Sequence, residues 1–313
     1  MLFQDPRQHS IGQFNKIRAD AKNIERLNTT ELVYLLAQLA TQGLPEFLPI
    51  HDYLWSRTQR ADIKAFLRRC HDEWCGILDL PGFAQMLADT PLLNVAYALN
   101  KPYFEKGTQQ PESLLVVFTT MFNNFYISNL ALLALIRKIG VSVLVLKDPT
   151  VFNFLNGING LGRDFQRSMA RLVDFAKQNQ VAKLVTLGYS SGGYAALLAS
   201  VELKATGCLA LAVHSDYSGA SLLPQPRFMS DEVRAQIPQH WLVNLRDYLS
   251  LCNSGCERRL FFGEQSRKDS LHAQNLAGMK NVSVEKVENC GHAVVSPLFT
   301  SGRLEAELRA LLH

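Results

Sequence analysis

The residues with the clearest capacity for chemistry lie in the segment Leu184–Leu198, where Ser190 stands between Gly188 and Gly192. Glycines two residues before and two residues after a serine mark a nucleophile that is held on a very tight turn. Side chains at those two positions would collide across the turn, and glycine removes them. The pattern G-x-S-x-G therefore makes Ser190 a candidate nucleophile for acyl transfer.

The sequence around Ser190 predicts the two elements that such a turn must join. The apolar stretch 183–188 is typical of a buried strand, and the Ala- and Leu-rich stretch 193–200 is typical of a helix. Ser190 would then project at the C-terminal edge of a sheet. The backbone N–H of Ser191 would lie at the N-terminus of the helix, where it can donate to an oxyanion.

A nucleophilic serine needs a histidine base and an acid that orients the base, in the chain order serine, acid, histidine. His292 follows the predicted strand 282–287 and is the candidate base. Two acids, Glu264 and Asp269, follow the predicted strand 259–262 in a loop. Asp269 is favoured, because Glu264 stands so close to the strand end that it is expected to fall short of His292.

With these residues in this order, residues 113–313 resemble the α/β-hydrolase superfamily through the segments GYSSGG, FFGEQSRKDSLHA and NCGHAV. The resemblance implies that Ser190 is the nucleophile, His292 the general base and then acid, and Asp269 the residue that orients His292. The chain departs from the family at the acid. Asp269 follows the strand-end Gly263 by six residues, whereas the family's acid often follows by three or four, so the choice between Asp269 and Glu264 stays open.

The resemblance also implies the oxyanion hole and the residues that contact the substrate. Ser191 supplies one backbone N–H, and the loop after the predicted strand 113–121 supplies the other, for which Thr120 is the candidate. That loop has no HGGG-type motif, which argues against the esterases similar to hormone-sensitive lipase. The residues expected to contact the substrate are aromatic: Phe122, Tyr189 and Trp241. Phe122, with its neighbours Phe125 and Tyr126, either lines an acyl pocket or belongs to the core under the cap.

Strand-like and helix-like stretches alternate from residue 111 onward, which predicts an α/β fold with a mostly parallel central sheet and helices on both faces. The expected strands cover 113–121, 141–147, 183–188, 207–214, 259–262 and 282–287. The expected helices cover 130–139, 164–179, 193–200, 271–279 and 304–312. Residues 215–257 separate two core strands and are expected to form a cap, with one or two helices, over the site.

Residues 1–110 are expected to form an all-α N-terminal region, followed by the hydrolase-like domain 111–313 after a turn-rich polar segment. Helices are predicted over 10–27, 30–39 and 63–75, and one or two more within 83–99. No motif in this region carries chemistry. Its expected roles are to pack on the domain, to complete the pocket or to bind a partner protein.

Three further residues compete for a place in the site. His272 is expected in a helix after the acid loop, facing solvent. His214 and Asp148 each end a predicted strand, at the edge where α/β proteins bind ligands. Each of these two either lines the pocket or is an ordinary polar residue at a strand end.

Composition and charge exclude several classes of protein. The 313 residues are 47% hydrophobic and 19% charged, which excludes a disordered chain. The net charge of +4 comes from scattered Lys and Arg, which argues against a nucleic-acid partner. No apolar stretch approaches the roughly 20 residues of a membrane span. The chain begins without a secretory signal, so a cytoplasmic protein with reduced cysteines is expected.

Neither a cofactor nor a metal is expected. The Gly-rich turn lacks the Lys-Ser/Thr ending of a phosphate-binding loop. Cys252 and Cys256 have no partner ligands at zinc-site spacing.

The sequence therefore predicts a serine hydrolase that acts on a small-molecule ester or thioester. The same residues would serve an O-acyltransferase, in which an alcohol such as a saccharide takes the place of water. A third reading is a non-catalytic interaction protein built on the hydrolase fold. The intact serine, acid and histidine argue against this reading.

Overall fold

The structure is a computed structural model that describes residues 25–26, 44–65, 67–68, 71, 102–120, 125–127, 129–148, 150–226, 228–252 and 255–313. The chain divides into two compact units, one of Met1–Leu99 with Ile127–Ala134 and one of Asn100–Tyr126 with Leu135–His313. The serine, acid and histidine that the sequence singles out all belong to the second unit.

The first unit contains helix α4 (Leu44–Arg57), followed by further helical residues from Ala61 onward. His51 in α4 donates from Nε2 to the carbonyl of Leu67 at 3.2 Å, which joins the two helical stretches. Leu54, Ile63 and Leu67, from these two stretches, are buried. Apolar residues of both stretches are therefore withdrawn from solvent.

The predicted helices of this region are only partly covered by the described residues. The helix expected at 63–75 is present where the structure describes it, and α4 was not predicted. Residues 25–26, which fall inside the helix expected at 10–27, form a turn. The helices expected at 30–39 and 83–99 lie outside the described residues.

The second unit is built on a sheet whose described strands follow the order β1-β3-β2-β4-β5-β6-β7. Strand β1, at one edge, runs antiparallel to β3, and every other neighbouring pair among the described strands is parallel. The strands are β1 (Tyr103–Glu105), β2 (Gln110–Phe118), β3 (Val141–Leu146), β4 (Lys183–Tyr189), β5 (Gly207–Leu211), β6 (Glu257–Gly263) and β7 (Val282–Val287). A mostly parallel sheet was predicted, and it is confirmed.

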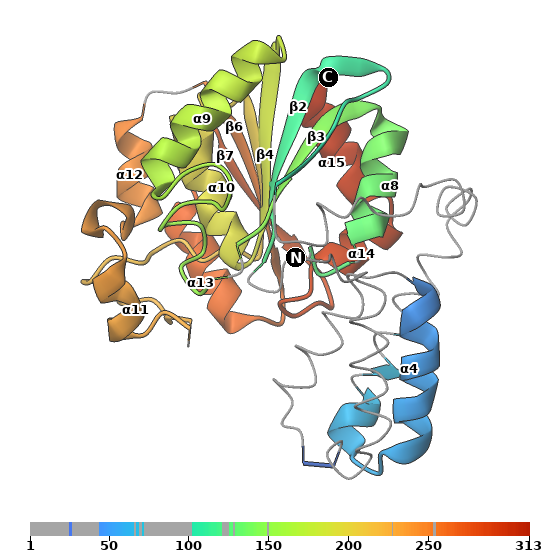
Figure 1. Cartoon of the computed structure of the whole chain (residues 1–313). Helices are drawn as coiled ribbons and strands as arrows, with labels where there is room; N and C mark the ends of the chain where they lie inside the picture. Colours follow the sequence, from blue (N-terminus) through green and yellow to red (C-terminus); the bar gives the residue numbers. More distant parts are fainter. Residues whose placement is uncertain are drawn as a thin grey trace, which may run out of the picture. The chain divides into compact units, whose positions relative to one another are not determined.

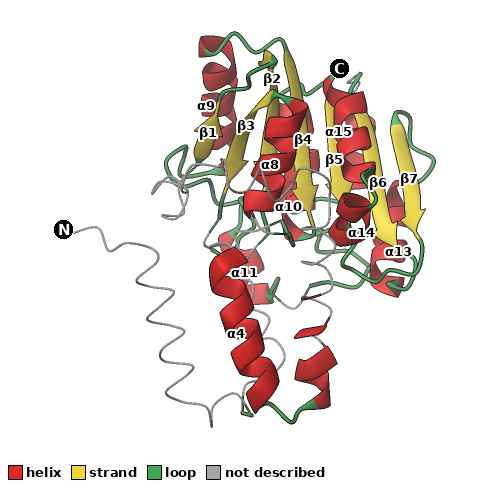
Figure 2. Ribbon diagram, turned by 90° about the vertical axis from the view of Figure 1, so that its right-hand side faces the viewer, coloured by secondary structure: helices red, strands yellow, loops and turns green. Residues whose placement is uncertain are grey.

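Helices cover both faces of this sheet (Figures 1 and 2). One face carries α9 (Phe165–Gln178), α10 (Ser191–Glu202), α12 (Leu245–Leu251) and α13 (Arg267–Leu276). The other carries α14 (Val295–Thr300), α15 (Arg303–Leu312) and the last turn of α8 (Asn129–Ile139). None of the described helices is both long and apolar enough to cross a membrane.

The burial of the strands follows from their sequences. All six residues of β3 are buried, as are the last six of β2, because both strands lie inside the sheet under helices. The edge strand β7 alternates half-buried Val282 and Val284 with exposed Ser283 and Glu285. Charged side chains on an exposed edge discourage pairing with another chain.

In the second unit, two described elements outside residues 215–257 were not predicted from the sequence. Strand β1 has only three residues, and α14 has six. Elements this short carry too few residues for a period of 2 or 3.6 to be recognised. Their assignment depends on their neighbours: β1 pairs with β3, and α14 packs on α15.

The segment expected to form a cap contains α11 (Asp231–Gln236), a short 3₁₀ helix η1 (Gln239–Trp241) and α12. Tyr194, a fully buried residue of α10, anchors this segment. Its hydroxyl accepts from the N–H of Val243 at 3.0 Å and donates to the carbonyl of Trp241 at 2.8 Å. The segment therefore packs on α10, the helix that follows Ser190.

Candidate active site

Ser190 occupies the turn between β4 and α10, with φ of 54° and ψ of −117°. A positive φ is costly for a residue with a side chain, and such strain collects at functional sites. The surrounding structure holds the turn in place. The N–H of Ser190 donates to the carbonyl of Leu211 in β5 at 2.8 Å, and its carbonyl accepts from the N–H of Gly193 at 3.0 Å.

The two glycines that flank Ser190 are required by close packing. A Cβ on Gly188 would overlap the carbonyl of Gly192 and would lie 2.7 Å from Cβ of Ala196. A Cβ on Gly192 would overlap the carbonyls of Phe118 and Thr119, at the end of β2. No side chain fits at either position, which is the reason the sequence pattern suggested.

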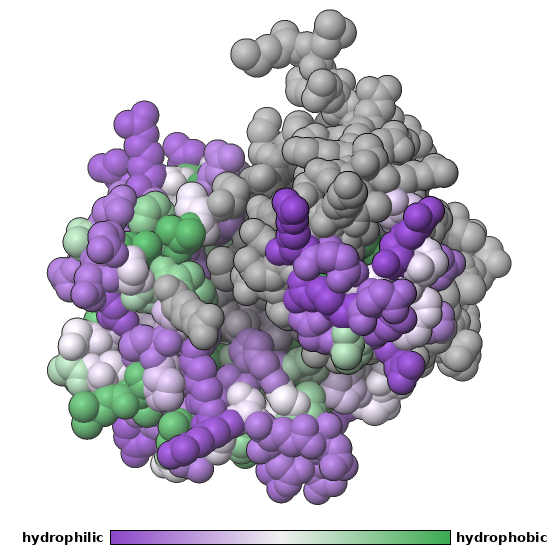
Figure 3. Space-filling model, turned by 90° about the horizontal axis from the view of Figure 1, so that it is seen from below, coloured by the Kyte–Doolittle hydropathy of each residue, from purple (hydrophilic) through white to green (hydrophobic). Residues whose placement is uncertain are grey.

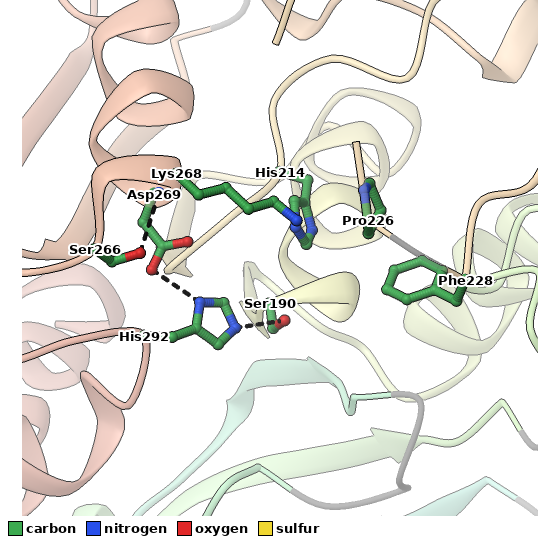
Figure 4. A pocket seen from close by; sticks show the side chains of 8 residues that line it. All are labelled: Ser190, His214, Pro226, Phe228, Ser266, Lys268, Asp269 and His292. Atoms are coloured by element: carbon green, nitrogen blue, oxygen red, sulfur yellow. Dashed lines mark hydrogen bonds and ion pairs between the residues drawn. The ribbon is translucent and has the colours of Figure 1, made fainter. Parts of the chain in front are cut away.

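His292 lies between Ser190 and Asp269 and is hydrogen-bonded to both (Figure 4). Its Nδ1 is 2.8 Å from Oδ2 of Asp269, and its Nε2 is 2.8 Å from Oγ of Ser190. A carboxylate only accepts hydrogen bonds, so Nδ1 carries the proton and Nε2 accepts from the serine hydroxyl. The chain of bonds leaves Nε2 ready to take a proton from Ser190.

The structure brings Asp269, and not Glu264, to His292. Asp269 is 2% exposed and lies in the first turn of α13, where its N–H donates to Oγ of Ser266, the N-cap residue. The sequence placed it in a loop, and this was wrong. Glu264 points to solvent and pairs with Lys286 on β7 at 2.7 Å. The hydrogen bond with Lys286, and then the one from the N–H of Asn289, lower the pKa of Glu264.

A serine on a strand-to-helix turn, an acid after a later strand and a histidine after the last strand, all at the carboxyl edge of a parallel sheet, define one architecture. The second unit has the α/β-hydrolase fold. The sequence itself matches no protein-family model and no curated protein.

Solved structures with similarity to this α/β-hydrolase fold cover about two thirds of the chain. Est1E from Butyrivibrio proteoclasticus, solved with ferulic acid bound, is 15% identical over 66% of this chain and 95% of its own, with a TM-score of 0.45. MenH from S. aureus is 14% identical over 68% and 98%, with a TM-score of 0.47. An S-formylglutathione hydrolase from Agrobacterium tumefaciens is 11% identical over 66% and 86%, with a TM-score of 0.45.

The two predicted oxyanion-hole residues lie at neighbouring chain segments of the α/β-hydrolase unit. Ser191 is the first residue of α10, and Thr120 follows β2; both are buried. The tight contact of Gly192 with the carbonyls of Phe118 and Thr119 holds the end of β2 against the start of α10. The N–H of Thr119 already donates to the carbonyl of Leu146, so it is not free for an oxyanion.

The three aromatic residues expected to contact the substrate lie in different parts of the chain's structure, and one lies outside the described residues. Phe122 lies outside the described residues. Tyr189 is 3% exposed and supports the His292 loop: its ring lies 5.3 Å from the imidazole, and its hydroxyl donates to the carbonyl of His292 at 3.2 Å. Trp241 is buried in the core, edge-on to Phe165 at 4.8 Å, and does not line the cavity described below.

A cavity of about 320 Å³ opens beside Ser190, at the carboxyl edge of the sheet. Figure 3 views the molecule from this side, where the described surface is mostly hydrophilic with scattered hydrophobic areas. The cavity is lined by Ser190, His214, Pro226, Phe228, Ser266, Lys268, Asp269 and His292 (Figure 4). Four of these, Pro226, Phe228, Ser266 and Lys268, were missed in the sequence. Of these four residues, only Lys268 could have been suggested from the sequence, because it directly precedes Asp269, the favoured acid.

The structure also places His272 and Asp148, two of the residues that competed for a role in the site. His272 was expected to face solvent, and this was wrong: it is fully buried, with Nδ1 accepting from the N–H of Ser215 and Nε2 donating to the carbonyl of Pro224, each at 3.0 Å. It ties α13 to the first part of the segment 215–257. Asp148 is buried and accepts from the N–H groups of Thr150 and Phe154, so it stabilises a turn outside the cavity.

Proposed function

We propose that the protein is a serine hydrolase that cleaves a small-molecule ester or thioester through an acyl-serine intermediate. The observation that carries this proposal is the unbroken chain of hydrogen bonds Ser190–His292–Asp269 at the wall of a cavity. A serine in a Gly-rich turn without a base would have no means of losing its proton. Here Nε2 of His292 lies 2.8 Å from Oγ of Ser190, and the hydrogen bond from Nδ1 to Asp269 fixes the tautomer of the imidazole.

In the first half of the reaction, Nε2 of His292 takes the hydroxyl proton as Oγ of Ser190 attacks the substrate carbonyl. The carbonyl oxygen becomes an oxyanion, which we assign to the backbone N–H groups of Ser191 and Thr120. The bond from the carbonyl carbon to the leaving oxygen or sulfur then breaks. The leaving group takes the proton from His292, and the acyl group remains on Ser190.

In the second half, water attacks the acyl-serine and gives its proton to His292. The carbonyl carbon releases Oγ of Ser190, which recovers the proton, and the carboxylic acid leaves. The side chain of His292 is 43% exposed, so water can reach it without a large rearrangement. Asp269, at 2% exposed, holds the imidazole and stabilises the imidazolium that forms in both halves.

The same steps would serve an O-acyltransferase if an alcohol, such as a sugar hydroxyl, replaced water in the second half. The serine, base and acid would be identical in both enzymes. The product distinguishes them, because hydrolysis releases a free acid and transfer yields a new ester.

Labelling with a fluorophosphonate probe tests the proposal, with the modified peptide identified by mass spectrometry. Stoichiometric labelling of Ser190 is expected in the wild type and is expected to disappear in His292→Ala. The matched control is His240→Ala, which removes an exposed histidine of the cap segment and should label normally. If Ser190 fails to label and 4-nitrophenyl acetate is not cleaved, the non-catalytic reading replaces the proposal.

A further inference from the structure

Lys268 is the one lysine that lines the described cavity, and the mechanism does not use it. It stands in the first turn of α13, directly before Asp269, and is half-buried. Figure 4 shows its side chain running along the cavity wall with its ammonium end beside His214. A cation is therefore presented to whatever fills the space next to Ser190.

This ammonium has no counter-ion among the described residues. Its sequence neighbour Asp269 is the nearest acid that influences it, but the carboxylate of Asp269 is bonded to His292. Burial lowers the pKa of Lys268, because the cation is partly withdrawn from water, and Asp269 only partly opposes this. A half-buried charge without a partner is unfavourable, and an anion delivered by a ligand would relieve it.

His214 adds unused hydrogen-bonding capacity at the same wall. It is 3% exposed and lines the cavity, and its Nδ1, which is buried, has no hydrogen-bond partner among the described residues. Burial, and then the positive charge of Lys268, hold the pKa of His214 well below its ordinary value. The ring is therefore neutral at neutral pH and can donate one hydrogen bond without adding a second charge.

We propose that Lys268 and His214 bind a carboxylate on the substrate, so that the preferred ester or thioester is acidic. One cation and one neutral donor match the single charge of a carboxylate better than the double charge of a phosphate monoester. The inference rests on the proposed function, because that function places the scissile bond at Ser190. The binding of the anion depends only on Lys268 and His214.

The opposite wall indicates the rest of the substrate. Pro226 and Phe228, from the segment before α11, present apolar surface to the cavity. The volume of about 320 Å³ stands at the small end of the range for small-molecule sites. A short aliphatic chain that carries a terminal carboxylate fits both walls: its methylenes contact Phe228, and its carboxylate contacts Lys268.

The first test compares two esters that differ only in charge: the mono-4-nitrophenyl ester of adipic acid and its methyl-capped diester. We expect wild-type kcat/KM to be about tenfold or more higher for the acidic ester, as a charged hydrogen bond would give. Lys268→Met should remove that preference and Lys268→Arg should keep most of it. The matched control, Lys280→Met, removes an exposed lysine at the opposite end of β7 and should leave the preference unchanged.

The second test does not depend on turnover. Binding of monomethyl adipate and dimethyl adipate to the full-length Ser190→Ala variant is measured by calorimetry. The acidic ligand should bind about tenfold or more tightly, and adding Lys268→Met should abolish the difference. Equal binding of both ligands overturns the inference, even if Ser190 labels and esters are cleaved. If binding depends on Lys268 but Ser190 does not label, the anion site is supported and the proposed hydrolase activity is contradicted.

Discussion

The Nδ1–H of His292 donates to Oδ2 of Asp269 at 2.8 Å, across the gap between the loop after β7 and the first turn of α13. Strands β6 and β7 are parallel neighbours, so the segments that follow them leave the sheet side by side. The contact therefore depends on how two adjacent strands end. It orients the imidazole whose other nitrogen faces Ser190.

Replacement of Asp269 by Asn should lower kcat/KM for ester hydrolysis by about a thousandfold or more. An amide in place of the carboxylate favours the wrong imidazole tautomer and cannot stabilise an imidazolium. Steady-state kinetics measures the effect. The matched control is Glu264→Gln, which breaks only an exposed ion pair with Lys286 and should leave kcat/KM within about threefold. A larger loss in the control than in Asp269→Asn would make Glu264 the acid.

Gly188→Ala should destabilise the fold by about 1–3 kcal/mol or more, because its Cβ would overlap the carbonyl of Gly192. Gly193→Ala is the matched change one turn further on. There the added Cβ would lie 3.1 Å from Cβ and Cγ2 of Val213 and would overlap no backbone atom, so a smaller loss is expected. Urea unfolding of the two variants gives the comparison. Equal stabilities would contradict the tight turn at Ser190.

Tyr194→Phe should destabilise the protein by about 1–3 kcal/mol, because it leaves the N–H of Val243 and the buried carbonyl of Trp241 without their common partner. Tyr248→Phe provides the control. It also deletes one hydroxyl, but that hydroxyl bonds Glu202 in a half-buried position and its loss should matter less. Limited proteolysis can then show whether the Tyr194 variant is cut first in residues 215–257.

Protein stability should fall as the pH drops from about 7 to 5, and His272 should account for part of the fall. Burial lowers the pKa of His272 below its ordinary value of about 6.5, against the weaker pull of its Pro224 bond and of nearby Asp269 and Asp216. Between the folded and unfolded pKa values, the unfolded chain binds more protons, so falling pH favours unfolding. A protonated His272 would also lose the bond from Ser215.

Thermal unfolding from pH 5 to pH 8 measures this dependence. His272→Gln cannot titrate, so its stability should vary less with pH in this range. The slope should not vanish, because the pKa of buried His214 is lowered as well. His240→Gln, at an exposed position, should keep the wild-type slope. An unchanged slope in His272→Gln would contradict a neutral, buried imidazole.

Much of the second unit follows from local sequence. Buried parallel strands need continuous apolar residues, so β2, β3 and β4 stand out within short windows. The turn at Ser190 also stands out, because close backbone contact at Gly188 and Gly192 leaves room only for glycine. Elements such as β1 and α14 are held by their neighbours and carry no comparable local signal.

The sequence by itself determined the α/β-hydrolase fold, Ser190 as the candidate nucleophile and His292 as the candidate base, because each depends on residues close together in the chain. Tertiary structure alone decided which acid meets His292: α13 begins at Arg267 and turns Asp269 inward, while Glu264 pairs with Lys286. Tertiary structure also decided that Trp241 is buried in the core and that His272 bonds the carbonyl of Pro224 in the segment 215–257. Such choices depend on the packing of segments far apart in the sequence, which no local pattern records.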